Sequence, residues 1–390
     1  MGATGTTAAG AKTGLGTLGI IGGGQLAKMC AQAASQLGIE VCILERAERF
    51  PARHLAAATL RGDWDDGEEV AALARQCDVV TLENEFVDAR ALRHAEQHGA
   101  IVRPGSATMA TVQDKFLQKT AFAQAGLPLP RFAAVESPAD AVLFARAHGW
   151  PVVLKKRRNG YDGKGNATVR GEHELDAAWA RLGGSGLYVE AFCPFERELA
   201  IVAVRAHDGE RVAYPLVETI NADHICRVVV APADASLDIA RRATQIALAA
   251  IDSVGGVGAF GMELFLKKDG EVLVNEIAPR VHNTGHYTIE GCECSQFENH
   301  VRAAMGLPLG STALRARCAV MVNLLGSGPG PARPAGLEAA LAERGVAVHI
   351  YGKDASSKGR KMGHVTAIGD DPREVLARAE RAAAAIRFGG

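Results

Sequence analysis

The chain has 390 residues, of which 48% are hydrophobic and 22% are charged, and its formal net charge is −1. This length predicts two or three domains, and the composition is typical of globular proteins. The near-zero net charge excludes a general electrostatic field for nucleic acid or for a membrane surface.

Further features of the composition favour a cytoplasmic enzyme. The eight cysteines have no repeated CxxC spacing, which favours reduced thiols over a zinc site. No apolar run reaches about 18 residues and no basic-then-apolar leader is present, so we expect neither a membrane span nor a secretion signal. Residues 1–14 are mainly Gly, Ala and Thr, and we expect a disordered extension there.

The first predicted unit alternates strands and helices. Its elements are 18–21, 25–37, 40–44, 79–82, 89–98 and a short strand at 101–102. This order predicts βαβ units and an N-terminal Rossmann-like domain at 15–110.

A glycine-rich turn joins the first strand to the first helix. Gly22 to Ala27 match GxGxxA, and the helix N-terminus that follows could bind an anion. Glu45, at the end of the next strand, could hold a ribose hydroxyl, which would make this a dinucleotide site. Close packing of the helix on the strand is the alternative explanation for the glycines.

The second unit, at 111–193, is a small block of strands and helices that could act as a mobile lid. Its expected elements are helices 114–125, 139–148 and 172–182 and strands 131–135, 152–156, 166–170 and 187–192. The glycine-rich loop 160–166 joins two strands and therefore is not a P-loop. Its backbone could lie against phosphate oxygens, with Lys155 and Lys164 supplying charge, or it could be a flexible hairpin tip.

The third region, at 194–390, contains a candidate metal site. We expect strands 198–204, 213–218, 346–351 and 364–368, helices 238–254 and 295–305, a hairpin over 260–277 and a closing helix. An Asp269-Gly270 turn of two residues, both at φ > 0, would place Glu263 directly opposite Glu276. Like charges so placed destabilise a sheet unless a cation bridges them, and Mg²⁺ bound to phosphate is the usual cation. Glutamates that turn away into water are the alternative.

Three weaker patterns could contribute to the same site. Backbone groups after Glu190 could pair with an adenine edge, and Glu198 could bind ribose hydroxyls, although strand ends of this kind are common. Arg280 and His282 share the parity of Glu276 along the chain. The last pattern is a basic turn that could anchor a phosphate or lie in solvent, formed by Lys358, Arg360 and Lys361.

With these motifs the chain resembles the ATP-grasp enzymes and, among them, the N5-carboxyaminoimidazole ribonucleotide synthetases of purine synthesis. The resemblance runs from about Leu18 to the C-terminal region. It is carried by the segments 22–29, 113–115, 160–166, 194–198, 275–288 and 359–364. It implies an α/β fold of three domains: the Rossmann-like domain at 15–110, a central α+β ATP-grasp lid at 111–193, and a C-terminal ATP-grasp domain with a small subdomain at 194–390.

The resemblance also implies ligands for particular residues. For ATP it implies Lys115, Lys155, Gly160, Tyr161, Asp162, Gly163, Lys164, Gly165, Asn166, Glu190, Ala191, Phe192, Cys193, Glu198, Asn221, Asn275 and Glu276. For Mg²⁺ it implies Glu263 and Glu276. For the ribonucleotide it implies Gln25, Glu83, Glu85, Lys358, Arg360 and Lys361. Catalytic roles near bicarbonate fall to Arg280, His282, Tyr161 and Lys361.

The implied reaction is the ATP-dependent carboxylation of 5-aminoimidazole ribonucleotide by bicarbonate, through carboxyphosphate, in a homodimer. Two departures from the family pattern bear on it. Residues 83–86 read Glu-Asn-Glu-Phe where the family usually has Glu-Phe-Glu-Asn, and the usual histidine near the ATP phosphates is Asn221, with His224 three residues on. The alternatives are therefore an ATP-grasp enzyme with another acceptor, a non-catalytic ATP-binding paralogue, and a dinucleotide-dependent oxidoreductase.

Overall fold

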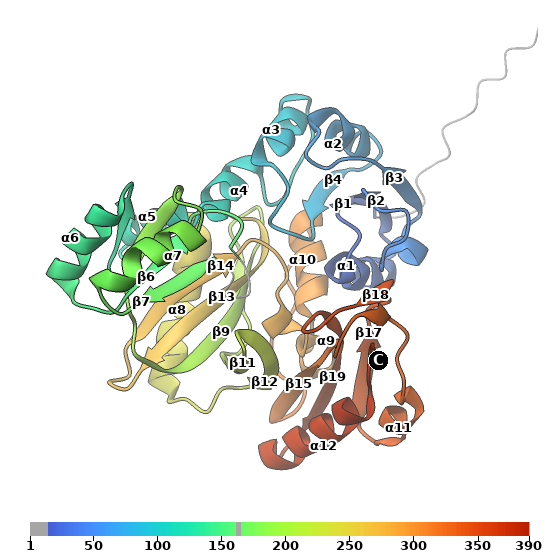
Figure 1. Cartoon of the computed structure of the whole chain (residues 1–390). Helices are drawn as coiled ribbons and strands as arrows, with labels where there is room; N and C mark the ends of the chain where they lie inside the picture. The colour runs from blue at the N-terminus through green and yellow to red at the C-terminus, as the bar shows by residue number, and fades with distance from the viewer. Residues whose placement is uncertain (1–14, 161–164, 390) are drawn as a thin grey trace, which may run out of the picture.

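The computed structural model describes residues 15–160 and 165–389. The expected extension at 1–14 and the loop residues Tyr161, Asp162, Gly163 and Lys164 lie outside the described residues. The predicted α/β class is confirmed, with separate sheets for the N-terminal, central and C-terminal parts of the chain (Figure 1). We keep 15–110, 111–193 and 194–390 as a working division into domains.

The N-terminal sheet is parallel and has the order β3-β2-β1-β4. Its strands are β1 (Thr17–Ile21), β2 (Glu40–Glu45), β3 (Ala58–Arg61) and β4 (Val79–Leu82), and its helices are α1 (Gln25–Gln36), α2 (Gly67–Ala74) and α3 (Ala89–Gln97). Helices α2 and α3 cover one face of the sheet, while α1 and the later helix α10 (Gln296–Met305) cover the other. The predicted strand at 101–102 was wrong, because only Val102 forms an isolated bridge, to Val80.

The central part is an antiparallel sheet of order β5-β8-β6-β7 with two helices packed on it. The strands are β5 (Phe132–Val135), β6 (Val152–Lys156), β7 (Asn166–Val169) and β8 (Leu187–Ala191), and the helices are α6 (Pro138–His148) and α7 (Leu175–Arg181). Two helices connect it to the N-terminal sheet, α4 (Ser106–Gln113) and α5 (Lys115–Gln124). Asp114 begins α5, because its carboxylate accepts the backbone N–H groups of Phe116 and Leu117.

The largest sheet has the order β14-β13-β9-β11-β12-β15-β19-β17, with β10 beside β9. Its strands are β9 (Phe195–Arg205), β10 (Arg211–Ala213), β11 (Val217–Ala222), β12 (Ile225–Ala231), β13 (Gly258–Lys267), β14 (Val272–Ala278), β15 (Cys318–Leu325), β17 (Val346–Ile350) and β19 (Lys361–Gly369). Helix α8 (Leu237–Ser253) packs on the β13–β14 end, and α12 (Pro372–Ala385) on the β15–β19 end. The smaller elements are α9 (Thr288–Gly291), α11 (Leu337–Ala342), β16 (Gly330–Pro331), β18 (Ala355–Ser356) and the 3₁₀ turns η1 (Arg53–Leu55), η2 (Glu172–Glu174) and η3 (Asn283–Gly285).

The hairpin β13–β14 pairs Glu263 with Glu276 as predicted, but for a different reason. Lys267 and Glu271 face each other across a loop of three residues in which only Gly270 has a positive φ, so the expected two-residue turn was wrong. A β-bulge at Asn275 shifts the register back by one residue. Because of the bulge, the consecutive residues Asn275 and Glu276 both line the cleft described below.

A two-residue turn with positive φ occurs elsewhere, between β11 and β12. Asp223 (φ 54°) and His224 (φ 61°) form it. The strand predicted over 213–218 is interrupted in the structure. Strand β10 ends at Ala213 and β11 begins at Val217, with Pro215 between them, and both strands pair with β9. Among the described residues, no helix is long and apolar enough to cross a membrane.

Candidate active site

One cleft of about 1940 Å³ is lined by residues of the N-terminal sheet, the central sheet and the large sheet. Most of the predicted site residues line it: Gln25, Glu83, Glu85, Lys115, Lys155, Gly160, Gly165, Asn166, Glu190, Ala191, Phe192, Cys193, Glu198, Asn221, Glu263, Asn275, Glu276, Arg280, His282 and Lys361. The other two described candidates, Lys358 and Arg360, do not line this cleft. Lys358 and Arg360 are exposed, and Arg360 donates to the carbonyl oxygen of Ala355 at 2.6 Å.

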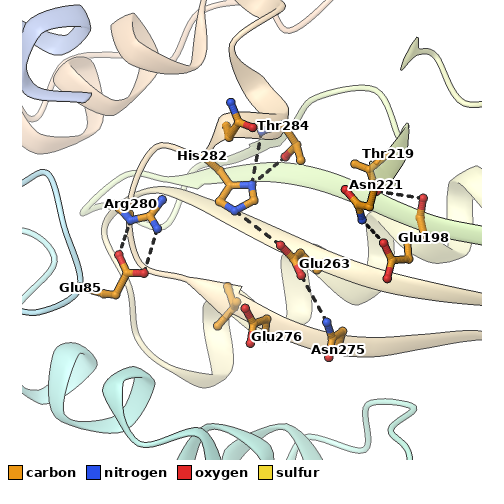
Figure 2. A network of polar contacts seen from close by, with 12 residues as sticks. Glu85, Glu198, Thr219, Asn221, Glu263, Asn275, Glu276, Arg280, His282 and Thr284 are labelled. Carbon is orange, nitrogen blue, oxygen red and sulfur yellow. Dashed lines mark hydrogen bonds and ion pairs between the residues drawn. The ribbon is translucent and has the colours of Figure 1, made fainter. Parts of the chain in front are cut away.

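The two facing glutamates, whose positions Figure 2 shows, differ in their partners. Glu276 forms an ion pair with Lys115, and this ammonium keeps the pKa of Glu276 below its usual value although burial raises it. From the described residues Glu263 accepts a neutral hydrogen bond, from Asn275 Nδ2 at 3.2 Å. Burial and the charge of Glu276 raise the pKa of Glu263 to about 7. The pair therefore carries more negative charge than its protein neighbours balance, and its oxygen donors suit Mg²⁺.

Glu190 has a role that the sequence did not indicate. Its buried carboxylate binds Lys119 Nζ at 2.9 Å and Lys155 Nζ at 2.7 Å. Burial raises its pKa, but the two ammonium groups lower it to about 2. Lys119 was missed by the sequence analysis; the available signal was its position one helical turn after Lys115. Lys155 also donates to Asn275 Oδ1 at 3.4 Å, which connects this triad to the glutamate pair.

Arg280 and His282 occupy the side of the cleft nearest the N-terminal sheet. The guanidinium of Arg280 forms a two-point ion pair with Glu85, which fixes its plane (Figure 2). His282 Nδ1 lies 2.8 Å from Thr284 Oγ1, and the backbone N–H of Thr284 donates to the same nitrogen. The other ring nitrogen, Nε2, lies 3.8 Å from Glu263 Oε1. Burial, Arg280 and Lys361 lower the pKa of His282 to about 3, so the imidazole is neutral.

Glu198 and Asn221 meet on neighbouring strands. Asn221 Nδ2 donates to the Glu198 carboxylate, and Thr219 Oγ1 donates to the Glu198 carbonyl oxygen at 3.2 Å (Figure 2). Asn221 therefore orients Glu198 in this structure, a role that the sequence did not predict for it.

The glycine turn before α1 is already occupied by carboxylates of the chain. Glu45 accepts the N–H of Gly23 at 2.7 Å, and Glu83 accepts the N–H groups of Gly24 at 2.7 Å and Ala27 at 3.1 Å. The backbone donors that a dinucleotide pyrophosphate needs are thus used, and the structure argues against the dinucleotide interpretation. Glu83 remains at the cleft wall beside Gln25.

Comparisons with protein families give matches along most of the chain. Three family models match: the ribonucleotide synthetase preATP-grasp domain at 15–113, the ATP-grasp domain at 120–297, and the phosphoribosylaminoimidazole carboxylase C-terminal domain at 319–378. The chain is therefore an ATP-grasp protein.

Individual relatives define the family more closely. The N5-carboxyaminoimidazole ribonucleotide synthase of Synechococcus elongatus is 43% identical over 350 residues, which are 90% of this chain and 88% of that protein. The chloroplastic phosphoribosylaminoimidazole carboxylase of Vigna aconitifolia is 39% identical over 90% of this chain, which spans only 64% of that protein. The solved structure of the Aspergillus clavatus synthase, in complex with ADP and 5-aminoimidazole ribonucleotide, is 35% identical with a TM-score of 0.86 and covers 94% of this chain and 97% of its own. The chain belongs to the N5-carboxyaminoimidazole ribonucleotide synthase family.

Proposed function

We propose that this chain is a ligase of purine biosynthesis that carboxylates 5-aminoimidazole ribonucleotide with bicarbonate and ATP, giving N5-carboxyaminoimidazole ribonucleotide, ADP and phosphate. The observation that carries the proposal is the Glu263–Glu276 pair with Lys115, in one cleft with Arg280 and His282. The relative from Aspergillus clavatus, whose structure contains ADP and the ribonucleotide, supports the choice of substrates.

In this proposal the ATP phosphates lie between the lid and the glutamate hairpin. Lys115 and Lys155 face them from two sides, and Gly160, Gly165 and Asn166 supply backbone and amide groups at the described ends of the lid loop. Glu263 and Glu276 would hold Mg²⁺, which spreads the phosphate charge when it is bound. Once a cation and the phosphates are present, Lys115 is free to turn from Glu276 towards the nucleotide. Glu198, oriented by Asn221, would bind the ribose hydroxyls.

The chemistry needs positioned charge rather than a covalent intermediate on the protein. A bicarbonate oxygen attacks the γ-phosphorus, and the bond to the bridging oxygen breaks with loss of ADP. The resulting carboxyphosphate breaks into CO₂ and phosphate, and the substrate amine attacks the CO₂ carbon and loses a proton. Arg280 would hold the bicarbonate or carboxyphosphate oxygens, since Glu85 fixes its plane. The neutral His282 can donate its Nε2 hydrogen to these oxygens, and closure of the lid would exclude water from the intermediate.

The test is ADP release measured with ATP, Mg²⁺ and bicarbonate, with and without the ribonucleotide. We expect the ribonucleotide to stimulate release and Glu276→Ala to abolish it. Glu271→Ala is the matched control, because Glu271 lies on the same hairpin but pairs with Lys267 at the far end of it. ATP binding without any response to the ribonucleotide would favour another acceptor or a non-catalytic protein, and would contradict the proposed reaction.

A cytoplasmic location and a homodimer also belong to this proposal. The location agrees with the cysteines of the described chain, which form no disulfides. The homodimer rests on the family resemblance alone, and the mass of the protein in solution tests it.

A further inference from the structure

Two cysteines of the N-terminal sheet lie against each other although they are far apart in the sequence. Cys42 is in the middle of β2, and Cys77 is in the turn between α2 and β4. Cys42 is the register partner of Gly19 on β1, so its side chain and the hydrogen of Gly19 share one face of the sheet. Cys77 Sγ fills the space that the missing side chain leaves, 3.0 Å from where a Cβ on Gly19 would lie. There the two thiols share a hydrogen bond.

The surroundings of this pair differ from those of Cys292 and Cys294. Cys42 is buried, but Cys77 is partly exposed and gives small oxidants access to the pair. The hydrogen bond from Cys77 lowers the pKa of Cys42 to about 7, whereas burial raises the pKa of Cys292 and of Cys294 to about 12. A thiolate is the reactive form of cysteine, so Cys42 is available for oxidation at neutral pH while Cys292 and Cys294 are not.

We propose that Cys42 and Cys77 form a reversible disulfide when the protein meets a peroxide. The Cys42 thiolate attacks one peroxide oxygen, the O–O bond breaks, and the second oxygen leaves as water after taking a proton. The Cys77 sulfur then attacks the Cys42 sulfenic acid, the S–O bond breaks, and a second water leaves with the Cys77 proton. The two sulfurs supply both electrons, and an external dithiol reverses the reaction.

The disulfide would join β2 to the segment that enters β4, on either side of β1. It closes the loop that contains β3 and α2, and such a closure stabilises a fold mainly by restricting the unfolded chain. Oxidation is therefore expected to raise the Tm by several degrees. This inference does not depend on the proposed reaction of the cleft.

The experiment treats the reduced full-length protein with hydrogen peroxide and then counts thiols after denaturation. We expect two of the eight thiols to be lost, a cross-linked pair of peptides containing Cys42 and Cys77, and recovery of both thiols with dithiothreitol. Cys292 lies outside this sheet, so the Cys292→Ser variant should still form the cross-link. Cys77→Ser should form none and should show no rise in Tm on oxidation.

Two results would overturn the proposal. One is a wild-type protein that keeps all eight thiols under conditions that oxidise dithiothreitol in the same buffer. The other is an unchanged rise in Tm and an unchanged loss of two thiols in Cys77→Ser. Cys77 is partly exposed, so its serine variant is expected to fold; Cys42→Ala is a second variant that must also abolish the cross-link.

Discussion

The carboxylate of Glu190 is shared by two buried lysines, so the three charges of this triad contribute unequally to stability. Without Glu190, Lys119 and Lys155 would be two ammonium groups beside each other and away from water. Without Lys119, one carboxylate and one ammonium would remain as a balanced pair. Removal of one partner of a buried pair is strongly destabilising because it leaves a charge unbalanced, whereas removal of Lys119 leaves Glu190 balanced by Lys155.

We therefore predict opposite sensitivities for two variants of the triad. Glu190→Gln should lower the free energy of unfolding by about 3–5 kcal/mol, and Lys119→Met should change it by about 1 kcal/mol or less. Urea denaturation at pH 7 measures both. A Lys119→Met variant that is as unstable as Glu190→Gln would show that both lysines are needed to balance Glu190.

Residues of the site were predictable where their chemistry could be read from local spacing. The pairing of Glu263 with Glu276 follows from a short hairpin, and it is confirmed. The position of Lys119 could be noticed, but its partner could not be predicted, because Glu190 on β8 is brought close to α5 only by the tertiary fold. The contact of Glu83 was not predictable either, because its carboxylate, just after β4, reaches the start of α1 only in the folded protein.

At the scale of elements, the hairpin shows that a correct pairing can follow from an incorrect turn. The loop has one residue more than expected and the bulge at Asn275 compensates for it. Sequence patterns do not reveal a bulge, since it only shifts which residues face which. Here it has a consequence for the site, because it brings Asn275 to the cleft beside Glu276.

Two substitutions in the loop distinguish the observed turn from the expected one. Gly270 has φ 81°, so Gly270→Ala should lower the free energy of unfolding by about 1 kcal/mol. Asp269 has no positive φ and accepts the N–H of Glu271 at 3.0 Å, so Asp269→Gly should also destabilise the protein, by a few tenths of a kcal/mol. If the loop were instead a two-residue turn with positive φ at both positions, Asp269→Gly would stabilise the protein. Thermal denaturation of both variants decides between the turns.

Helices and strands were predicted where their apolar pattern was strong, and missed where it was weak or interrupted. The edge strand β3 alternates between half-buried and exposed residues, and α4 has little difference between its faces. Strand β15 is different, because the apolar run at 318–322 is a visible signal of a buried strand. The break at Pro215 was a visible signal, because proline cannot donate a hydrogen bond to the neighbouring strand β9.

Lys28 on α1 connects the N-terminal sheet to the end of β17. Its Nζ donates to the carbonyl oxygens of Ile350 at 2.8 Å and Tyr351 at 3.4 Å. Removal of this contact should loosen the chain after β17, whose Tyr351 lines the cleft as Gln25 does, but not the glutamate hairpin. We predict that Lys28→Met raises the KM for the ribonucleotide about tenfold and leaves the KM for ATP unchanged, equivalent to about 1.4 kcal/mol.

Steady-state kinetics with each substrate varied in turn measures this difference. Lys268→Met is the control, because it removes the same charge from an exposed residue at the tip of the hairpin. An equal rise in both KM values for Lys28→Met would mean that Lys28 supports the fold as a whole.

At the scale of the whole molecule, one helix joins parts that lie far apart in the chain. Helix α10 lies between the N-terminal sheet and the large sheet (Figure 1), and its buried His300 contacts both. Nε2 of His300 lies 2.9 Å from Thr81 Oγ1 on β4, and Nδ1 accepts the N–H of Ala259 on β13 at 3.0 Å. Since Nδ1 is an acceptor, the ring is neutral and its hydrogen is on Nε2.

This geometry predicts how stability depends on pH. Burial lowers the pKa of His300 from 6.5 to about 4 in the folded protein. Above pH 6.5 the ring is neutral in the folded and in the unfolded protein, and its contribution to stability is complete. Below pH 6.5 the unfolded chain binds a proton that the folded chain does not, so the free energy of unfolding decreases as the pH decreases. Between pH 7 and 5 this loss is roughly 2 kcal/mol for His300 alone.

Urea denaturation across this range should show a smaller slope of unfolding free energy against pH for His300→Gln than for the wild type, even if the variant is less stable at every pH. His207→Gln, a change at an exposed histidine, should keep the wild-type slope. Equal slopes for His300→Gln and the wild type would mean that His300 is not held neutral between the two sheets.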